Sequence, residues 1–83
     1  MVKGIVKFGS LKDINKFVTE ASKCDFCIDI KRGSKILDGK SIEGLCILQL
    51  NLELECILHT NIANTVEFTD KIKEFIVEDF EQM

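Results

Sequence analysis

The sequence predicts a small α+β domain, in which an antiparallel sheet of four strands is covered on one face by three helices. Segments with an apolar residue at every second position alternate with segments whose apolar residues recur every three or four positions. Each segment is apolar on one side only, which is the pattern of an antiparallel sheet with all its helices on a single face. The 83 residues are the length of one domain, and we expect it to span 1–83.

The first half of the chain predicts a strand, a helix and a hairpin. Residues 2–8 alternate between apolar and polar side chains. Ser10, with an acidic residue three positions later, resembles a capping box, so we expect a helix over 11–23. A second alternating segment over 26–32, a glycine-containing turn and a short returning strand over 34–37 complete the hairpin.

The second half predicts a short helix, a strand and a last helix. Ser41 opens the helix, which we expect to end near Gln49. Residues 53–60 alternate as a fourth strand. Asn64 is expected to cap the last helix. Its predicted buried stripe consists of Phe68, Ile72, Phe75, Ile76 and Phe80. The predicted order is therefore β-α-β-β-α-β-α.

Charge and hydropathy exclude two classes of partner. The formal net charge is -3 and the basic residues are scattered, whereas a nucleic-acid-binding protein needs a positive face. No apolar run approaches the ~20 residues that span a bilayer. The apolar stretch at the N-terminus is too short for a secretory signal, so we expect a cytoplasmic protein.

The four cysteines do not form a convincing site. Cys24 and Cys27 have C-x-x-C spacing, which occurs in redox sites and as half of a metal site. The favoured interpretation is structural, because no second pair follows and the one histidine, His59, is remote in sequence. Cys46 and Cys56 resemble ordinary small hydrophobic residues. We therefore expect no metal, no cofactor and no enzyme activity.

The element order and the segment at residues 40–45, KSIEGL, resemble the HPr family, the small phosphocarriers of the bacterial sugar phosphotransferase system. The family's regulatory serine lies in a K-S-I-x-G motif, and Ser41 matches it. The resemblance extends ungapped from Val18 to about Ile76, with VTEASK at 18–23 matching the end of the family's first helix. It implies a two-layer, open-faced β-sandwich with strand order 1-4-2-3.

The catalytic motif of the family, G-[IL]-H-[AT]-R-P, is altered here. Ser10 stands in place of the histidine, Lys12 in place of the arginine and Asp13 in place of the proline, and no register supplies a histidine. An imidazole at a helix start is nucleophilic at neutral pH, whereas a serine hydroxyl needs an adjacent base. We expect Ser10 to be only a cap, and His59 to be a solvent-facing strand residue that cannot replace the missing imidazole.

The resemblance implies a regulatory role centred on Ser41. The matching family serine is phosphorylated by an ATP-dependent HPr kinase, and a helix start suits the added negative charge. Family members that lack the histidine yet keep the serine act in carbon catabolite repression, by docking onto a transcription factor when they are phosphorylated. The alternative is a diverged protein-binding module that has lost both phosphorylation events and in which Ser41 only caps its helix. Phosphotransfer through an unrecognised residue ranks last.

The resemblance also implies a partner surface on the first two helices. Its expected members in the second helix are Ile42, Glu43, Leu45 and Cys46. Glu43 makes binding to the family's standard partners uncertain, because a carboxylate is costly to desolvate against an apolar partner. An exposed Leu48 or Leu52 would favour self-association, so a homo-oligomer is one of the expected assemblies.

Overall fold

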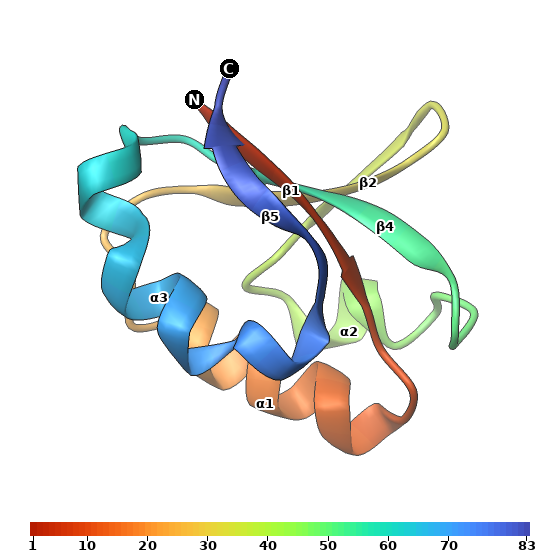
Figure 1. The fold of residues 1–83 in the computed structure, drawn as a ribbon. Coiled ribbons are helices and arrows are strands. Elements are labelled where there is room, and N and C mark those ends of the chain that lie inside the picture. Colours follow the sequence, from red (N-terminus) through yellow and green to blue (C-terminus); the bar gives the residue numbers. More distant parts are fainter.

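The computed structural model describes residues 1–83 and has two layers, an antiparallel sheet and the helices that cover it (Figure 1). The strands are β1 (Val2–Lys7), β2 (Ile28–Arg32), β3 (Lys35–Asp38), β4 (Glu53–Leu58) and β5 (Ile76–Gln82). The α-helices are α1 (Leu11–Ala21), α2 (Ile42–Leu45) and α3 (Val66–Lys71), with 3-10 turns η1 (Ile62–Thr65) and η2 (Lys73–Phe75) on either side of α3.

The predicted architecture is confirmed in its class and in most of its topology. The sheet order is β3-β2-β4-β1-β5, and every neighbouring pair is antiparallel. The helices lie on one face of the sheet, and Leu54, Cys56 and Leu58 of β4 are buried beneath them. None of the helices combines the length and the apolar character needed to cross a bilayer.

The prediction of four strands and a long last helix is wrong. Helix α3 ends at Lys71, and residues 76–82 form a fifth strand beside β1. Ile76 and Phe80 are four positions apart, which fits a helical stripe, but two register shifts in the β1–β5 pairing place both on the core side of a strand. Pairing of this segment with the free edge of β1 therefore decides its structure, in spite of the helical spacing of its apolar residues.

Two smaller boundaries also differ from the prediction. Helix α2 ends at Leu45 and not near Gln49, because the Leu48 N–H donates to the Leu45 carbonyl at 3.0 Å and tightens the chain into a turn. Asn64 does not cap α3. It lies inside η1, whose cap is Asn61, because the Asn61 side chain accepts a hydrogen bond from the Asn64 N–H, and the residue before α3 is Thr65, which makes no side-chain cap bond.

Phenylalanine rings join the layers in an edge-to-face chain. The Phe8 ring centroid lies 5.1 Å from Phe17 on α1 and 5.6 Å from Phe75 on η2. Phe17 is 5.7 Å from Phe68 on α3, which in turn is 6.4 Å from Phe26. Such pairs contribute about 0.5–1.5 kcal/mol each beyond the area they bury. This row of phenylalanine rings fixes the positions of α1 and α3 relative to the end of β1.

The contact between Gly4 on β1 and Phe80 on β5 explains why β5 pairs here. A Cβ added at Gly4 would stand 2.7 Å from Phe80 Cγ, so the ring lies directly over the glycine backbone. We expect Gly4→Ala to lower the free energy of unfolding by about 1–3 kcal/mol, because the methyl group must displace the ring. Urea denaturation measures the loss.

A double-mutant cycle isolates this contact. In a Phe80→Ala background, Gly4→Ala is expected to cost much less, since the ring that the methyl group would meet is gone. An equal cost in both backgrounds would show that β5 does not cover Gly4.

Candidate functional site

The head of α1 is closed by its own side chains. Ser10 has extended backbone angles, and its Oγ accepts a hydrogen bond from the Asp13 N–H at 3.2 Å. In return, the Gly9 N–H donates to Asp13 Oδ2 at 2.9 Å. The first bond is the cap that was predicted, and the second differs from a capping box by one residue, because Asp13 accepts from Gly9 and not from the N–H of the cap residue Ser10. Ser10 Oγ has no other hydrogen bond, so no base is placed to take its proton.

The surroundings of Ser10 are unfavourable to a further negative charge. An open hollow of about 410 Å³ beside the helix start is lined by Lys7, Asp13, Asn51 and Glu74 among others. The Asp13 carboxylate already occupies the Gly9 N–H, and Glu74 is paired with Lys16 on the next turn of α1. Lys12 is exposed to solvent. A phosphate at this helix start would therefore meet a carboxylate where a free N–H is needed.

His59 lies at the other end of the sheet from Ser10. The pairing of β1 with β4 places Lys7, which leads into α1, opposite Glu53, and Val2 opposite Leu58, which precedes His59. The His59 Nε2 atom is 2.7 Å from Asp29 Oδ2 on the open face of the sheet. The structure thus places His59 just after β4, half-exposed and paired with a carboxylate, and not at any helix start.

Ser41 begins α2 as predicted. Its backbone is extended and its Oγ accepts a hydrogen bond from the Gly44 N–H at 3.1 Å. The turn before it is compact, because Gly39 packs against Ile28 at a distance that leaves no room for a side chain. The Lys40 N–H donates to Asp38 Oδ1 at 2.9 Å. The Ser41 side chain is partly exposed and only accepts, which leaves its hydroxyl proton uncommitted.

The Lys40 side chain binds the end of α1. Its Nζ donates to the Cys24 carbonyl oxygen at 2.8 Å, three residues past the end of the helix. A cation near a helix C-terminus is favourable. This long-range bond, which the sequence did not reveal, ties the end of α1 to the start of α2.

The exposed part of α2 differs from the predicted partner surface. Leu45 is fully buried in the core, so it cannot contact a partner. Ile42, Glu43 and Cys46 are exposed, and Ile47 joins them with 65% of its surface accessible. Sequence reasoning missed Ile47 because it lies in a continuous apolar run. We call Ile42, Glu43, Cys46 and Ile47 the α2 surface.

The two leucines expected to favour self-association are largely covered. Leu48 is buried, and Leu52 is half-buried just before β4. Neither supplies the exposed apolar contact on which the expectation of a homo-oligomer rested.

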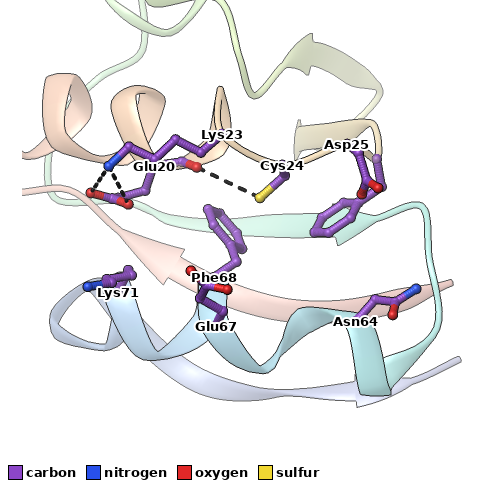
Figure 2. Close-up of a pocket in the computed structure, with 9 residues that line it drawn as sticks. Glu20, Lys23, Cys24, Asp25, Asn64, Glu67, Phe68 and Lys71 are labelled. Atoms are coloured by element: carbon purple, nitrogen blue, oxygen red, sulfur yellow. Dashed lines mark hydrogen bonds and ion pairs between the residues drawn. The ribbon is translucent and has the colours of Figure 1, made fainter.

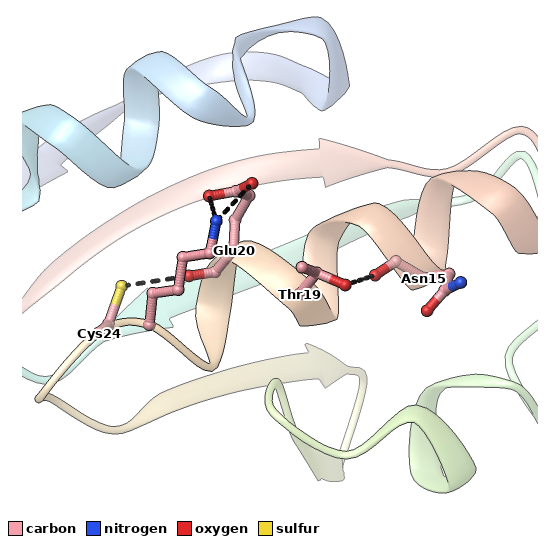
Figure 3. Close-up of polar contacts among 5 residues, drawn as sticks. Asn15, Thr19, Glu20 and Cys24 are labelled. Carbon is pink, nitrogen blue, oxygen red and sulfur yellow. Dashed lines mark hydrogen bonds and ion pairs between the residues drawn. The ribbon is translucent and has the colours of Figure 1, made fainter.

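The two cysteines of the C-x-x-C pair lie in different surroundings. Cys24 lines a hollow of about 300 Å³ between the end of α1 and α3 (Figure 2), and its Sγ donates to the Glu20 carbonyl (Figure 3). Desolvation raises the pKa of the Cys24 thiol, and the opposing effect of Lys40 is smaller. A thiol that stays protonated is a poor nucleophile and a poor ligand. Cys27 is exposed, and no three His, Cys, Asp or Glu residues converge for a metal.

Comparison of the sequence with protein-family models and with curated proteins gives no match. Comparison of the fold with solved structures gives several matches. The chain is similar to HPr-C-His from Thermoanaerobacter tengcongensis, with a TM-score of 0.70 and 17% identity over 89% of each chain. It is similar to the phosphocarrier protein HPr from Bacillus anthracis, with a TM-score of 0.66 and 16% identity over 89% of this chain and 94% of the other. The catabolite repression protein Crh of Bacillus subtilis, described as a swapped, intertwined dimer, gives a TM-score of 0.63 and 18% identity over 88% of both chains.

The chain has an HPr-like fold. The sheet contains the strand order 1-4-2-3 that the resemblance implied and adds β5 beyond β1. Ser10 and Ser41 occupy the starts of the first two helices of this fold. At 16–18% identity the comparison establishes the fold, while the roles of the individual residues rest on their own chemistry.

The hydrogen bond between Ser41 and Gly44 gives a direct test of the cap. Ser41→Ala should lower the free energy of unfolding by about 1 kcal/mol, since the Gly44 N–H loses its acceptor. Ser41→Asp should restore most of it, because aspartate also caps. Urea denaturation compares the two, with Ser10→Ala as the matched cap removal at α1. If Ser41→Asp were as unstable as Ser41→Ala, the cap would not explain this residue's contribution.

The buried thiol of Cys56 predicts a loss of stability at alkaline pH. Burial raises the pKa of Cys56 in the folded protein well above the value of about 8.5 for an unfolded thiol. Below about pH 8.5 the thiol is protonated in both states, and its contribution to the free energy of unfolding is fully present. Above about pH 8.5 the unfolded thiol loses its proton, and the free energy of unfolding falls by at most about 1.4 kcal/mol per pH unit. Urea unfolding from pH 7 to 10 should show this fall, and Cys56→Val should show a smaller one. Identical slopes in the two proteins would rule out Cys56 as the source.

Proposed function

We propose that this protein is an HPr-related regulatory protein of the bacterial phosphotransferase system, which acts by docking onto protein partners and is neither an enzyme nor a phosphocarrier. The observation that carries the proposal is the capped serine at the head of α1 of an HPr-like fold, at the position where the resemblance to the HPr family places the phosphorylated histidine. The protein works in the cytoplasm and needs no metal or cofactor.

The chemistry at Ser10 argues against phosphate transfer. Its hydroxyl has no neighbouring base, and the Asp13 carboxylate competes with any anion for the backbone N–H of Gly9. A serine phosphate would also be an ester too stable to pass its phosphoryl group onward. Ser10, Lys12 and Asp13 therefore hold the fold of the helix start and carry no phosphate.

The chemistry at Ser41 supports a regulatory phosphate. The side chain is partly exposed, its hydroxyl proton is uncommitted, and the Gly44 N–H already donates to its oxygen. A phosphate added there would gain charge-assisted hydrogen bonds from the start of α2. An ATP-dependent HPr kinase is the proposed donor enzyme.

The α2 surface is the proposed docking site. Ile42, Cys46 and Ile47 present exposed apolar atoms in the segment that follows Ser41, so a phosphate on the serine would add charge at the N-terminal margin of an apolar contact. A partner with basic side chains facing Ser41 and apolar side chains facing Ile47 would bind the phosphorylated form preferentially. Components of catabolite repression are the proposed partners, in keeping with the similarity to Crh.

Glu43 favours a second candidate function, a diverged protein-binding module without regulated phosphorylation. Its exposed carboxylate lies on the α2 surface and must be desolvated by an apolar partner. In this alternative Ser41 only caps α2, and the partner carries a donor that pairs with Glu43.

Intact-mass spectrometry of the purified protein in two incubations distinguishes the candidates. With ATP and an HPr kinase, we expect one added phosphate that is absent from Ser41→Ala and retained in Ser10→Ala, the matched loss of a capping serine. With phosphoenolpyruvate and enzyme I, we expect no change in mass.

Each other outcome selects a different function. An acid-labile phosphate from phosphoenolpyruvate would make the protein a phosphocarrier. No mass change in either incubation would leave the diverged binding module. Binding of a partner would then be abolished by Ile47→Asp without any requirement for Ser41.

A further inference from the structure

The outer side of β5 faces an open groove against α3 and η1. The sheet ends at β5, so the backbone groups on its outer side have no strand partner. The groove has a volume of about 460 Å³. Ile76 and Phe80 form its wall on the strand, and Ile62 and Val66 form its wall on the helical side. A strand edge and an apolar helical wall are thus presented side by side.

We propose that this groove binds an extended peptide segment of a partner protein, with alternating apolar and basic side chains, as an added strand beside β5. A segment that pairs with a sheet edge gains backbone hydrogen bonds, and every second side chain points into the same groove. Here the inward side chains would contact Val66 and Phe80. The two register shifts in β5 limit the pairing to a short ladder.

The charge of β5 selects a basic partner. The strand carries Glu78, Asp79 and Glu81 and no basic residue, and Asp70 adds a carboxylate on the helical side of the groove. Lys73 is the one cation in the groove lining. When the apolar side chains of the peptide point into the groove, its alternating lysine or arginine side chains point to the open face of the sheet. Glu78 and Glu81 lie on that face, opposite Ile5 and Lys3, so these carboxylates favour encounter and fix the register.

The same charges argue against a second copy of this chain in the groove. Two antiparallel β5 strands would bring their carboxylates opposite one another, and like charges in directly opposed positions destabilise a strand pair. Acidic side chains on an edge strand are a common protection against such self-pairing. The proposal for the groove does not depend on the proposed regulation at Ser41. Ser41 begins α2, which lies beside β3 at the opposite edge of the sheet.

Two synthetic peptides test the proposal by NMR on the 15N-labelled protein. The probe is a capped seven-residue peptide of alternating lysine and valine, and the comparison peptide replaces each lysine by glutamate. The lysine peptide should shift the amide signals of 62–71 and 76–82, and protect amides of β5 from solvent exchange. N-methylation of alternate peptide nitrogens should abolish binding, because it removes the strand hydrogen bonds.

A pair of matched variants locates the site. Val66→Arg removes an exposed apolar side chain from the groove and adds a positive charge, so it should weaken binding of the lysine peptide about tenfold or more. Ile36→Arg makes the same kind of change at an exposed residue of β3, at the far edge of the sheet, and should leave binding unchanged.

The proposal is overturned by any of four results. These are equal binding of the glutamate peptide, shifts centred on α1 and α2, equal affinities of the two arginine variants, and no shift at millimolar peptide.

Discussion

The edge-to-face packing of Phe8 against Phe17 and Phe75 is the interaction on which the rest of the structure depends. Phe8 follows β1 directly and precedes the capped start of α1, so its burial fixes the angle at which the helix leaves the sheet. Phe75 ends the segment that turns the chain from α3 into β5. One buried ring therefore positions both the head of α1 and the wall of the groove beside β5.

Local patterns predicted most of the fold because they reflect local causes. The alternation in 2–8 and 53–60 follows from the two-residue period of strand side chains, with one face on the core. The caps at Ser10 and Ser41 follow from hydrogen bonds that span three residues. Such signals depend little on the rest of the chain, and the structure confirms them.

The sequence-based predictions are wrong where contacts between distant parts of the chain determine the local structure. Ile76 and Phe80 fit a helix and a bulged strand equally well, and only the free edge of β1 and the uncovered Gly4 favour the strand. The spacing of Leu45, Cys46 and Ile47 does not tell which of the three faces the core. The bond from Lys40 to the Cys24 carbonyl joins residues 16 apart, and no sequence motif marks it.

The position of the two proposed surfaces at opposite edges of the sheet has a consequence for coupling between them. Helix α2, which carries the first of these surfaces, packs with β3 and α1, whereas the groove is formed by β5, α3 and η1. A change at Ser41 could reach the groove along the sheet from β3 to β5, or through α1 and the phenylalanine rings that join it to α3. Coupling between two sites needs an element with two discrete arrangements that both sites bias, and dense packing of the rings opposes such a rearrangement. Two partners could therefore occupy this small domain at once without either altering the affinity of the other.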